Sequence, residues 1–179
     1  AGTLTLMNPS NDFTSTVSIN NGIVKLGASE VIPNVENVTI NKGVLQLNGQ
    51  TETITSLTLG ATTTTVAGNT ASILDTPTGG ILRLGGNSTY NAGSIGFENG
   101  QATISANLDV NNASRTFTVN DNATLTEELV ISGVISNSGA AIAGFTKAGT
   151  GTHVIAGADN YYGTTTINAG TVKLGAENT

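Results

Sequence analysis

Short runs in which apolar and polar residues alternate recur along the chain, and a turn containing Asn or Gly precedes each of them. The best-preserved copies are Asn20–Leu26, Asn41–Leu47 and Asn168–Leu174, and weaker copies are Gly79–Leu84 and Asn99–Ile104. Strict alternation is typical of a half-buried β-strand, because successive side chains of a strand point to opposite faces. Each run therefore predicts a strand with two inward apolar residues and one outward residue between them.

A second alternating run stands directly before several of these turns. Its copies are Thr16–Ile19, Asn37–Ile40, Thr116–Val119 and Thr164–Ile167. One cycle therefore reads strand, Asn-x-Gly turn, strand and a looser polar stretch. A cycle covers about 20 residues, the usual size of a repeat that stacks on its neighbours. The spacing from Gly43 to Gly80 nearly doubles, which predicts a turn without the signature near residues 62–65.

Equivalent positions of successive cycles hold similar apolar residues. One position contains Val24, Leu45, Leu82 and Val172, and another contains Leu26, Leu47, Leu84 and Leu174. Stacked coils place such residues above one another at a spacing of ~4.8 Å and bury a continuous apolar column, which a sandwich of hairpins does not require. The sequence therefore predicts an all-β fold, a right-handed parallel β-helix (β-solenoid) with coils of about 20 residues.

Asparagine and glycine occupy the corners between the paired strands. Asparagine tolerates a left-handed backbone and bonds to local backbone groups. Two interpretations stay open for these side chains: they stack as a hydrogen-bonded ladder, or each only forms its own turn. Glycine supplies a positive φ or a close approach at the corner. The predicted ladder and turn residues are Asn20, Asn41, Asn120, Asn168, Gly22, Gly43 and Gly170.

The outward position between the two apolar residues is often cationic. It holds Lys25, Gln46, Arg83 and Lys173, which include three of the six cations of the chain. One interpretation is a basic stripe for an anionic ligand. The other, which we favour, is protection of an exposed strand face against aggregation.

The two ends of the chain also repeat each other over a longer span. Residues 24–28 (Val-Lys-Leu-Gly-Ala) return unchanged as residues 172–176, and Gly2-Thr3 corresponds to Gly151-Thr152. Together with Phe145–Thr152 and Ala158–Gly175, these segments resemble the autotransporter-associated β-strand repeat of bacterial passenger domains. This sequence departs from the pattern at His153 and at Tyr161-Tyr162. The resemblance implies a β-helix, an extracellular or outer-cell-surface location, and an adhesive or scaffold role without catalysis.

The last residues, Gly175–Thr179, follow a predicted core strand without an evident polar cap. Solenoids require capped ends for solubility. We therefore expect residues 1–179 to form a single β-helix segment that either belongs to a longer repeat array or stacks end to end as a filament subunit. Its expected partners are adjacent repeats or copies of itself.

Composition excludes several classes of partner and site. Polarity comes mainly from 30 Thr and 21 Asn, charged residues make up 10% and the net charge is −6. The absence of a basic cluster argues against nucleic acid as a partner. No apolar run approaches the ~18 residues of a membrane span. The lack of cysteine excludes disulfides and thiolate metal sites.

No catalytic, cofactor or metal site emerges from the sequence, so we expect a protein that is not an enzyme. His153 is the only histidine, has no ligands at metal spacing and is interpreted as structural. Glu127 and Glu128 point to opposite faces if they lie in a strand, which makes them a poor acid–base pair.

Two other function classes remain as alternatives. The first is a carbohydrate-binding or carbohydrate-active β-helix. The second is an ice-binding solenoid, because Thr-x-Thr pairs recur along the chain. It is less favoured, because these pairs fall at different phases of the coil. The paired Tyr161 and Tyr162 are the predicted exposed contact, for which surface glycans or host proteins are candidate partners.

Overall fold

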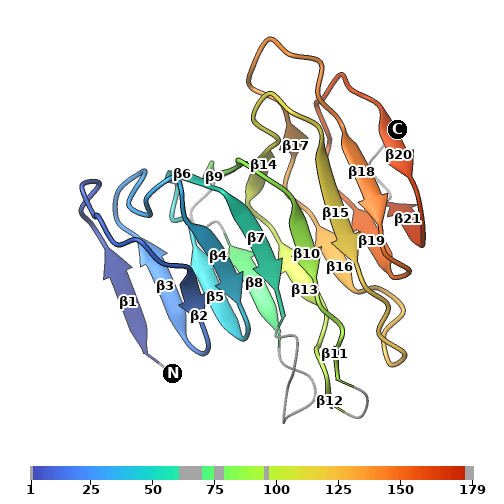
Figure 1. The fold of residues 1–179 in the computed structure, drawn as a ribbon, viewed down its shortest axis with the longest axis horizontal. Helices are drawn as coiled ribbons and strands as arrows, with labels where there is room; N and C mark the ends of the chain where they lie inside the picture. The colour runs from blue at the N-terminus through green and yellow to red at the C-terminus, as the bar shows by residue number, and fades with distance from the viewer. Residues whose placement is uncertain (1, 61–69, 75–78, 95–96, 176–179) are drawn as a thin grey trace.

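The computed structural model describes residues 2–60, 70–74, 79–94 and 97–175, which form β-strands and no helix (Figure 1). Most strands belong to three parallel sheets. Sheet A contains β1 (Thr3–Leu6), β3 (Ile23–Leu26), β5 (Gly43–Gln46), β8 (Ala71–Leu74), β13 (Ala102–Ile104), β16 (Leu129–Ile131), β19 (Thr152–Ile155) and β21 (Thr171–Leu174). Sheet B contains β2 (Val17–Ile19), β4 (Asn37–Ile40), β7 (Ser56–Leu59), β10 (Ser88–Tyr90), β15 (Arg115–Val119), β18 (Phe145–Ala148) and β20 (Thr165–Ile167). Sheet C contains β6 (Thr51–Ile54), β9 (Ile81–Leu84), β14 (Asn107–Asp109) and β17 (Ile135–Ser136).

The chain visits the sheets in the order B, A and C, and each strand then pairs in parallel with the equivalent strand of the next coil. The coil of β4, β5 and β6, for example, lies beside that of β7, β8 and β9. An antiparallel hairpin of β11 (Gly93–Ser94) and β12 (Phe97–Glu98) stands between β10 and β13. The predicted parallel β-helix is confirmed.

Coil length varies along the solenoid. The predicted length of about 20 residues holds at the two ends. Paired residues there are Thr3 with Ile23 and Thr152 with Thr171, which are 20 and 19 residues apart. In the middle, Ser72 pairs with Thr103, 31 residues later. The middle coils are longer mainly because their connections from sheet B to sheet A are longer: residues 91–101 join β10 to β13, whereas residues 20–22 join β2 to β3.

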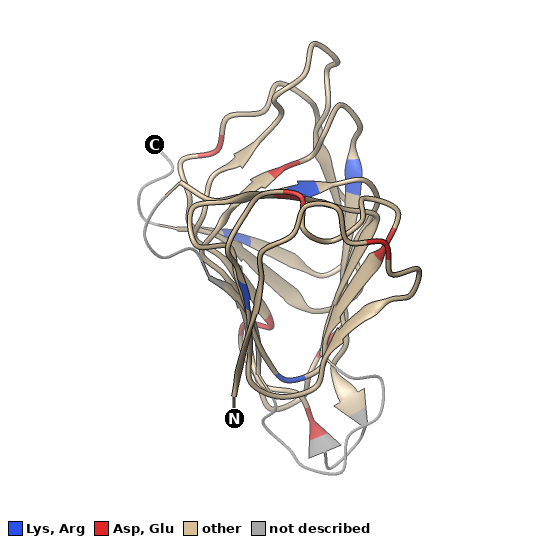
Figure 2. Ribbon diagram, turned by 90° about the vertical axis from the view of Figure 1, so that its left-hand side faces the viewer, with Lys and Arg blue, Asp and Glu red and all other residues tan. Residues whose placement is uncertain are grey.

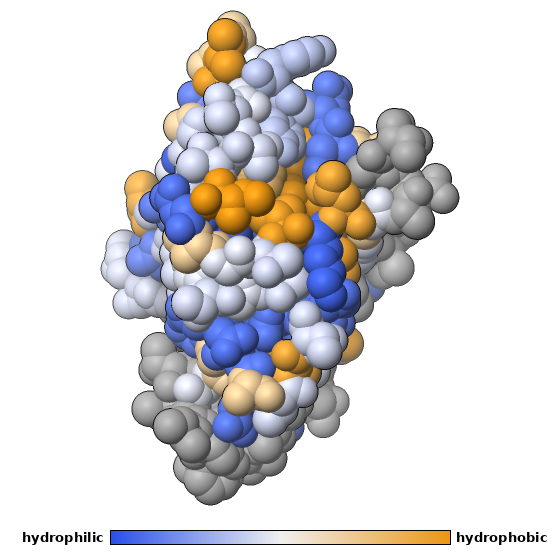
Figure 3. All heavy atoms as spheres, turned by 90° about the vertical axis from the view of Figure 1, so that its right-hand side faces the viewer, coloured by the Kyte–Doolittle hydropathy of each residue, from blue (hydrophilic) through white to orange (hydrophobic). Residues whose placement is uncertain are grey.

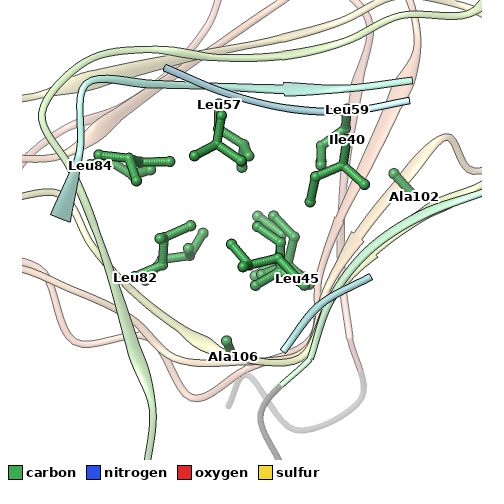
Figure 4. Packing of buried hydrophobic residues seen from close by; sticks show 14 of the residues in the cluster. Ile40, Leu45, Leu57, Leu59, Leu82, Leu84, Ala102 and Ala106 are labelled. Carbon is green, nitrogen blue, oxygen red and sulfur yellow. The ribbon is translucent and has the colours of Figure 1, made fainter. Parts of the chain in front are cut away.

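Inward side chains of all three sheets fill the interior. Figure 4 shows Leu45 of β5, Leu57 and Leu59 of β7 and Leu82 and Leu84 of β9 pointing into the space that the sheets enclose, and each is at most 1% exposed. Burying one leucine side chain stabilises the fold by roughly 1.5–3 kcal/mol.

The predicted equivalence of Leu82 and Leu84 with the sheet A residues is wrong. Both belong to β9, which pairs with β6 in sheet C, whereas the sheet A strand after β5 is β8. The two-residue alternation is the same in every sheet, so it cannot distinguish one sheet from another. The turn predicted near residues 62–65 lies outside the described residues.

The register of the sheets differs from the sequence repeat by two residues. Val24 is connected through successive sheet A pairs to Leu174, although the repeated motif aligns it with Val172. Sheet B shows the same displacement, because the pairs that begin at Val17 end at Ile167, whose counterpart in the motif is Ile19. A shift of two residues keeps every inward side chain inside, whereas a shift of one would reverse the faces.

Candidate functional site

The corner glycines pack closely from coil to coil. Gly22 and Gly43 have φ values of 96° and 119°, and Gly170 has a φ of 70°. A Cβ on Gly43 would clash with the carbonyl oxygen of Gly22, and a Cβ on Gly22 would lie 2.6 Å from that of Gly2. At the other end, a Cβ on Gly170 would clash with the carbonyl oxygen of Gly151. Both the backbone angle and the space therefore favour glycine at these corners.

The corner asparagines form one rung of a ladder. Asn41 Nδ2 donates to Asn20 Oδ1 at 2.7 Å. In the next coil, Gly60 occupies the position of the asparagine. The Gly60 N–H donates to the carbonyl oxygen of Ile40, just as the Asn41 N–H donates to the carbonyl oxygen of Ile19. Asn120 follows β15 at the equivalent position of a later coil.

Asn168 does not stack on Asn120. The residue before it, Ile167, pairs with Lys147, and Lys147 pairs with Phe117, so Asn168 stands in line with Thr118. The predicted equivalence of Asn168 with the other three asparagines is therefore wrong, and the two-residue register shift is the reason.

The four outward residues considered as a basic stripe do not share one line. Lys25 pairs with Gln46 in sheet A, but Arg83 lies in sheet C and Lys173 pairs with Val154. Lys173 Nζ lies 3.1 Å from Glu127 Oε1. Figure 2, a view from the N-terminal end, shows cationic and anionic residues distributed around the coils.

Arg83 joins acidic residues of two other coils. Its Nε lies 3.1 Å from Asp109 Oδ2, and its Nη1 lies 4.0 Å from Glu30 Oε1. Burial disfavours the charge of Asp109, but hydrogen bonds from Ser138, Asn111 and Arg83 outweigh it and lower the pKa of this carboxyl. Arg83 is therefore part of a structural network between coils.

A polar cluster that sequence analysis missed lies inside the C-terminal half. Lys147 is 0% exposed, and its Nζ donates to the carbonyl oxygens of Ala148 at 2.8 Å, Gly149 at 2.7 Å and Ala169 at 3.2 Å. Burial lowers the pKa of Lys147, although the charge of Glu128 opposes the shift. The alternation from Phe145 to Lys147 was the available signal, because it places both side chains on the inward face of β18.

His153 is fully buried beside the same strand. Its ring centroid lies 5.5 Å from that of Phe117 and 5.9 Å from that of Phe145, and neither ring nitrogen has a hydrogen-bond partner. Burial, helped by the charge of Lys147, lowers the pKa of His153 to about 3. The side chain is therefore a neutral part of the aromatic core at ordinary pH.

The two adjacent glutamates precede β16 and face different surroundings. Glu128 is 1% exposed and accepts hydrogen bonds from the backbone N–H groups of Thr152 and Asn122, whereas Glu127 reaches the exposed Lys173. No group of three or more potential metal-binding residues (His, Cys, Asp or Glu) occurs in the part of the chain that the structure describes.

Glu52 is a buried ionisable residue of the N-terminal half. Its carboxylate accepts from the N–H groups of Val31 at 2.9 Å and Ile32 at 3.1 Å, in the loop that replaces a sheet C strand in the preceding coil. Burial raises the pKa of Glu52 to about 7, the two backbone hydrogen bonds oppose this shift and the charge of Glu30 adds to it.

The two tyrosines have different environments. Tyr162 is 84% exposed. Tyr161 is partly buried, its ring centroid lies 5.7 Å from that of Phe145 in a T-shaped arrangement, and its hydroxyl is 2.7 Å from that of Thr165. Of the pair predicted as an exposed contact, only Tyr162 is available to a partner; Tyr161 supports the core.

Both ends of the solenoid expose strand edges and apolar side chains. Among the described residues, sheets A and B end on β1 and β2 at one end and on β21 and β20 at the other. Leu4 is 58% exposed and Ile23 36% exposed at the first end, and Ile167 is 53% exposed and Leu174 67% exposed at the second. Figure 3 shows apolar atoms across the centre of the C-terminal end. Such surfaces favour pairing with another strand or coil.

None of the described segments is a helix that could span a membrane. No curated protein and no solved structure matches the chain. The family model described as Passenger-associated-transport-repeat matches residues 1–26 and 145–174. The two matched segments contain β1 to β3 and β18 to β21, the two ends of the solenoid. Both end segments of the β-helix are therefore similar to this repeat.

Proposed function

We propose that this chain is a structural and adhesive β-solenoid segment of a secreted or cell-surface bacterial protein, and that its end coils continue the stack through adjacent repeats or copies of the chain. The unpaired edges of sheets A and B, with exposed inward residues at both ends, carry this proposal. A following coil would cover Leu174 as each coil covers the one before it. The passenger repeat at these same two ends supports the location outside the cell.

An adhesive contribution is assigned to the loops between strands. Tyr162 is 84% exposed and Ile142 is 80% exposed, and each lies in a loop next to sheet B of the C-terminal half. Exposed aromatic and aliphatic side chains on a rigid scaffold are the usual anchors of a protein or glycan contact.

Sedimentation velocity of the isolated chain tests end-to-end continuation. We expect association that increases with concentration and that Leu174→Lys weakens, because a charge at the open end opposes burial. Thr58→Lys, an outward substitution in the middle of sheet B, is the matched control and should leave association unchanged.

A tandem fusion of two copies tests covalent continuation. We expect a higher melting temperature than for the single chain, because nearest-neighbour interfaces stabilise solenoids. A chain that stays monomeric at all concentrations, and whose tandem fusion melts no higher than the single chain, would contradict the proposal.

A further inference from the structure

The outer face of sheet B differs in composition from the outer faces of the other two sheets. Sheet A carries Lys25 and Lys173 at outward positions, and sheet C carries Arg83. The outward positions of the described sheet B strands hold only serine, threonine, asparagine and alanine. This face therefore presents hydroxyl and amide groups, with neither a charge nor an aromatic ring.

Four threonines of successive coils form one row across this face. Thr39 pairs with Thr58, and Thr58 pairs with Thr89. Thr89 in turn pairs with Thr118. This threonine row runs through β4, β7, β10 and β15, which lie side by side in Figure 1, so it lies in the interior of the sheet and away from both ends. Neighbouring coils place its side chains about 4.8 Å apart.

A second polar row lies two residues earlier in the same strands. Asn37 pairs with Ser56 and Thr116 with Thr146, and Asn87 stands between these two pairs. Lateral hydrogen bonds fix this row: Ser56 Oγ donates to Asn37 Oδ1 at 2.6 Å, and the Thr116 N–H donates to Asn87 Oδ1 at 2.9 Å. The two rows are about 6.6 Å apart, which is twice the rise per residue of a strand.

The hydroxyl groups of the threonine row are available to solvent. Each of the four side chains is partly exposed, and none of their hydroxyl groups has a hydrogen-bond partner in the described part of the chain. The branched Cβ of threonine restricts χ1, so copies with the same backbone conformation present their hydroxyl and methyl groups alike. The row is therefore preorganised, and little side-chain entropy is lost when a partner binds.

Protection of the protein in solution does not account for this face. Charged side chains, lysine above all, normally keep exposed strands from associating, and the outward positions of sheet B lack them. The preference of threonine for strands does not explain the row either, because valine, isoleucine and tyrosine share that preference. The neutral face disfavours an ionic partner. Small-ligand and sugar sites are typically concave and lined by aromatic side chains, which these outward positions also lack.

We propose that the outer face of sheet B is a binding site for ice, with the threonine row at its centre. The surface of an ice crystal is an uncharged, periodic array of water molecules that expose hydrogen-bond donors and acceptors. Hydroxyl groups repeated at about 4.8 Å and about 6.6 Å hold water at equally regular positions. A charged residue would hold a hydration shell of its own and interrupt that order. This inference goes beyond the proposed function and does not depend on the ends of the solenoid.

The threonine row differs from the Thr-x-Thr pairs of the sequence. The pair at residues 3 and 5 lies in β1 of sheet A, and the pair at residues 51 and 53 lies in β6 of sheet C. These pairs are therefore out of phase with one another, as the sequence indicated. The row instead takes one threonine from each coil, and only the register of sheet B brings these residues into line.

Incorporation of the complete chain into slowly growing ice tests the proposal. The protein concentration is measured in the ice and in the remaining liquid. We expect the unmodified chain to enter the ice and Thr58→Lys to stay in the liquid, because its charge interrupts the row. Ser132→Lys, which replaces a hydroxyl by the same charge directly after β16 of sheet A, is the matched control and should still enter the ice. Exclusion of the unmodified chain, or equal incorporation of Thr58→Lys, would overturn the proposal.

Growth of a seed crystal gives a second readout. In a solution of the unmodified chain, the crystal should stop growing over a temperature interval below its melting point. This interval should be lost in Thr89→Lys and persist in Ser132→Lys. An equal interval in Thr89→Lys and the unmodified chain would show that another face contacts the ice, which contradicts the proposal. Circular dichroism of each variant checks that the fold is retained.

Two further results separate this proposal from other functions. Leu174→Lys, which is expected to weaken self-association, leaves sheet B intact and should enter the ice like the unmodified chain. Loss of association in Leu174→Lys without any incorporation of the unmodified chain would refute ice binding and leave end-to-end continuation intact. Binding to insoluble cellulose or chitin that Thr58→Lys abolishes, without incorporation into ice, would overturn the proposal and assign the face to an uncharged glycan.

Discussion

The two halves of the solenoid fill the same interior columns with different side chains. In the sheet B column, the first three coils contribute Val17, Val38 and Leu57, whereas later coils contribute Phe117 and Lys147. The N-terminal interior is mainly aliphatic with the buried acids Glu36 and Glu52, whereas the C-terminal interior contains aromatic rings and buries Lys147 and His153 as well as the acids Asp109 and Glu128. The difference shows that the sheet register fixes where a side chain points, while local backbone partners decide which polar groups are tolerated there.

Truncation of the aromatic core is expected to have the largest effect. Phe117→Ala should destabilise the protein by about 3–5 kcal/mol, because Phe117 is fully buried and contacts the rings of Phe145 and His153. Leu57→Ala, one of the preceding residues of the same column, should cost about 2–4 kcal/mol. Urea denaturation measures both. A larger loss for Leu57 would contradict the view that the rings dominate packing in the C-terminal half.

The next largest effect is expected in the pH dependence of stability, which should have opposite signs in the two halves. The folded pKa of Glu52, about 7, lies above its ordinary value of 4.5, so the folded state holds more protons and stability falls as pH rises from 4.5 to 7. The folded pKa of His153, about 3, lies below its ordinary value of 6.5, so stability is lost as pH falls from 6.5 towards 3. Each slope approaches ~1.4 kcal/mol per pH unit, and the two oppose each other between pH 4.5 and 6.5.

Single variants separate these slopes. Across that interval, Glu52→Gln should leave a stability that rises with pH, and His153→Leu one that falls with pH. Denaturation at pH 4.5 and at pH 6.5 measures the sign. If the halves unfold separately, as solenoids are able to do, their two transitions in the unmodified protein should move in opposite directions. An unchanged pH profile in both variants would show that neither group is coupled to folding.

Removal of the buried ammonium group gives an intermediate effect. Lys147→Met keeps a long side chain but leaves three carbonyl oxygens without their donor, so we expect a loss of about 1–3 kcal/mol. The same substitution at Lys173, an exposed cation beside Glu127, should change stability by less than about 0.5 kcal/mol. Similar losses of stability at the two lysines would mean that the three hydrogen bonds from Lys147 to carbonyl oxygens contribute nothing to the stability of the fold.

The smallest effect is expected at the asparagine pair. Asn41→Ala removes the exposed hydrogen bond to Asn20 and should cost about 0.5–1 kcal/mol. Asn168→Ala serves as the comparison, because Asn168 is displaced by two residues from the position of Asn20 and Asn41. A thermal melt of each variant resolves the difference, and equal losses would indicate that each asparagine acts only through its own turn.

The alternation of Val24, Lys25 and Leu26 was sufficient to predict strands, inward columns and coils. The same pattern in Leu82 to Leu84 led to the wrong sheet, because a period of two carries no information on which of three faces a strand occupies. The shifted position of Asn168 also could not be predicted, since a slip of two residues leaves the apolar pattern unchanged.

The sequence predicted only some of the buried ionisable groups. Burial of His153 agrees with its position in an alternating strand. Lys147 and Glu52 were missed because charged residues are almost never fully buried without partners. Lys147 donates to Ala169 in addition to its neighbours Ala148 and Gly149, and Glu52 accepts from Val31 and Ile32. Only the folded chain brings Ala169, Val31 and Ile32 to these side chains.

The hairpin of β11 and β12 has a practical consequence for protein engineering. It interrupts one corner, yet Thr89 still pairs with Thr118 before it and Thr103 with Val130 after it. The corner between β10 and β13 thus admits a projecting insert without disturbing the strands on either side. Since coils rise by ~4.8 Å each, peptides grafted at equivalent corners would be displayed at fixed, regular heights along a rigid rod.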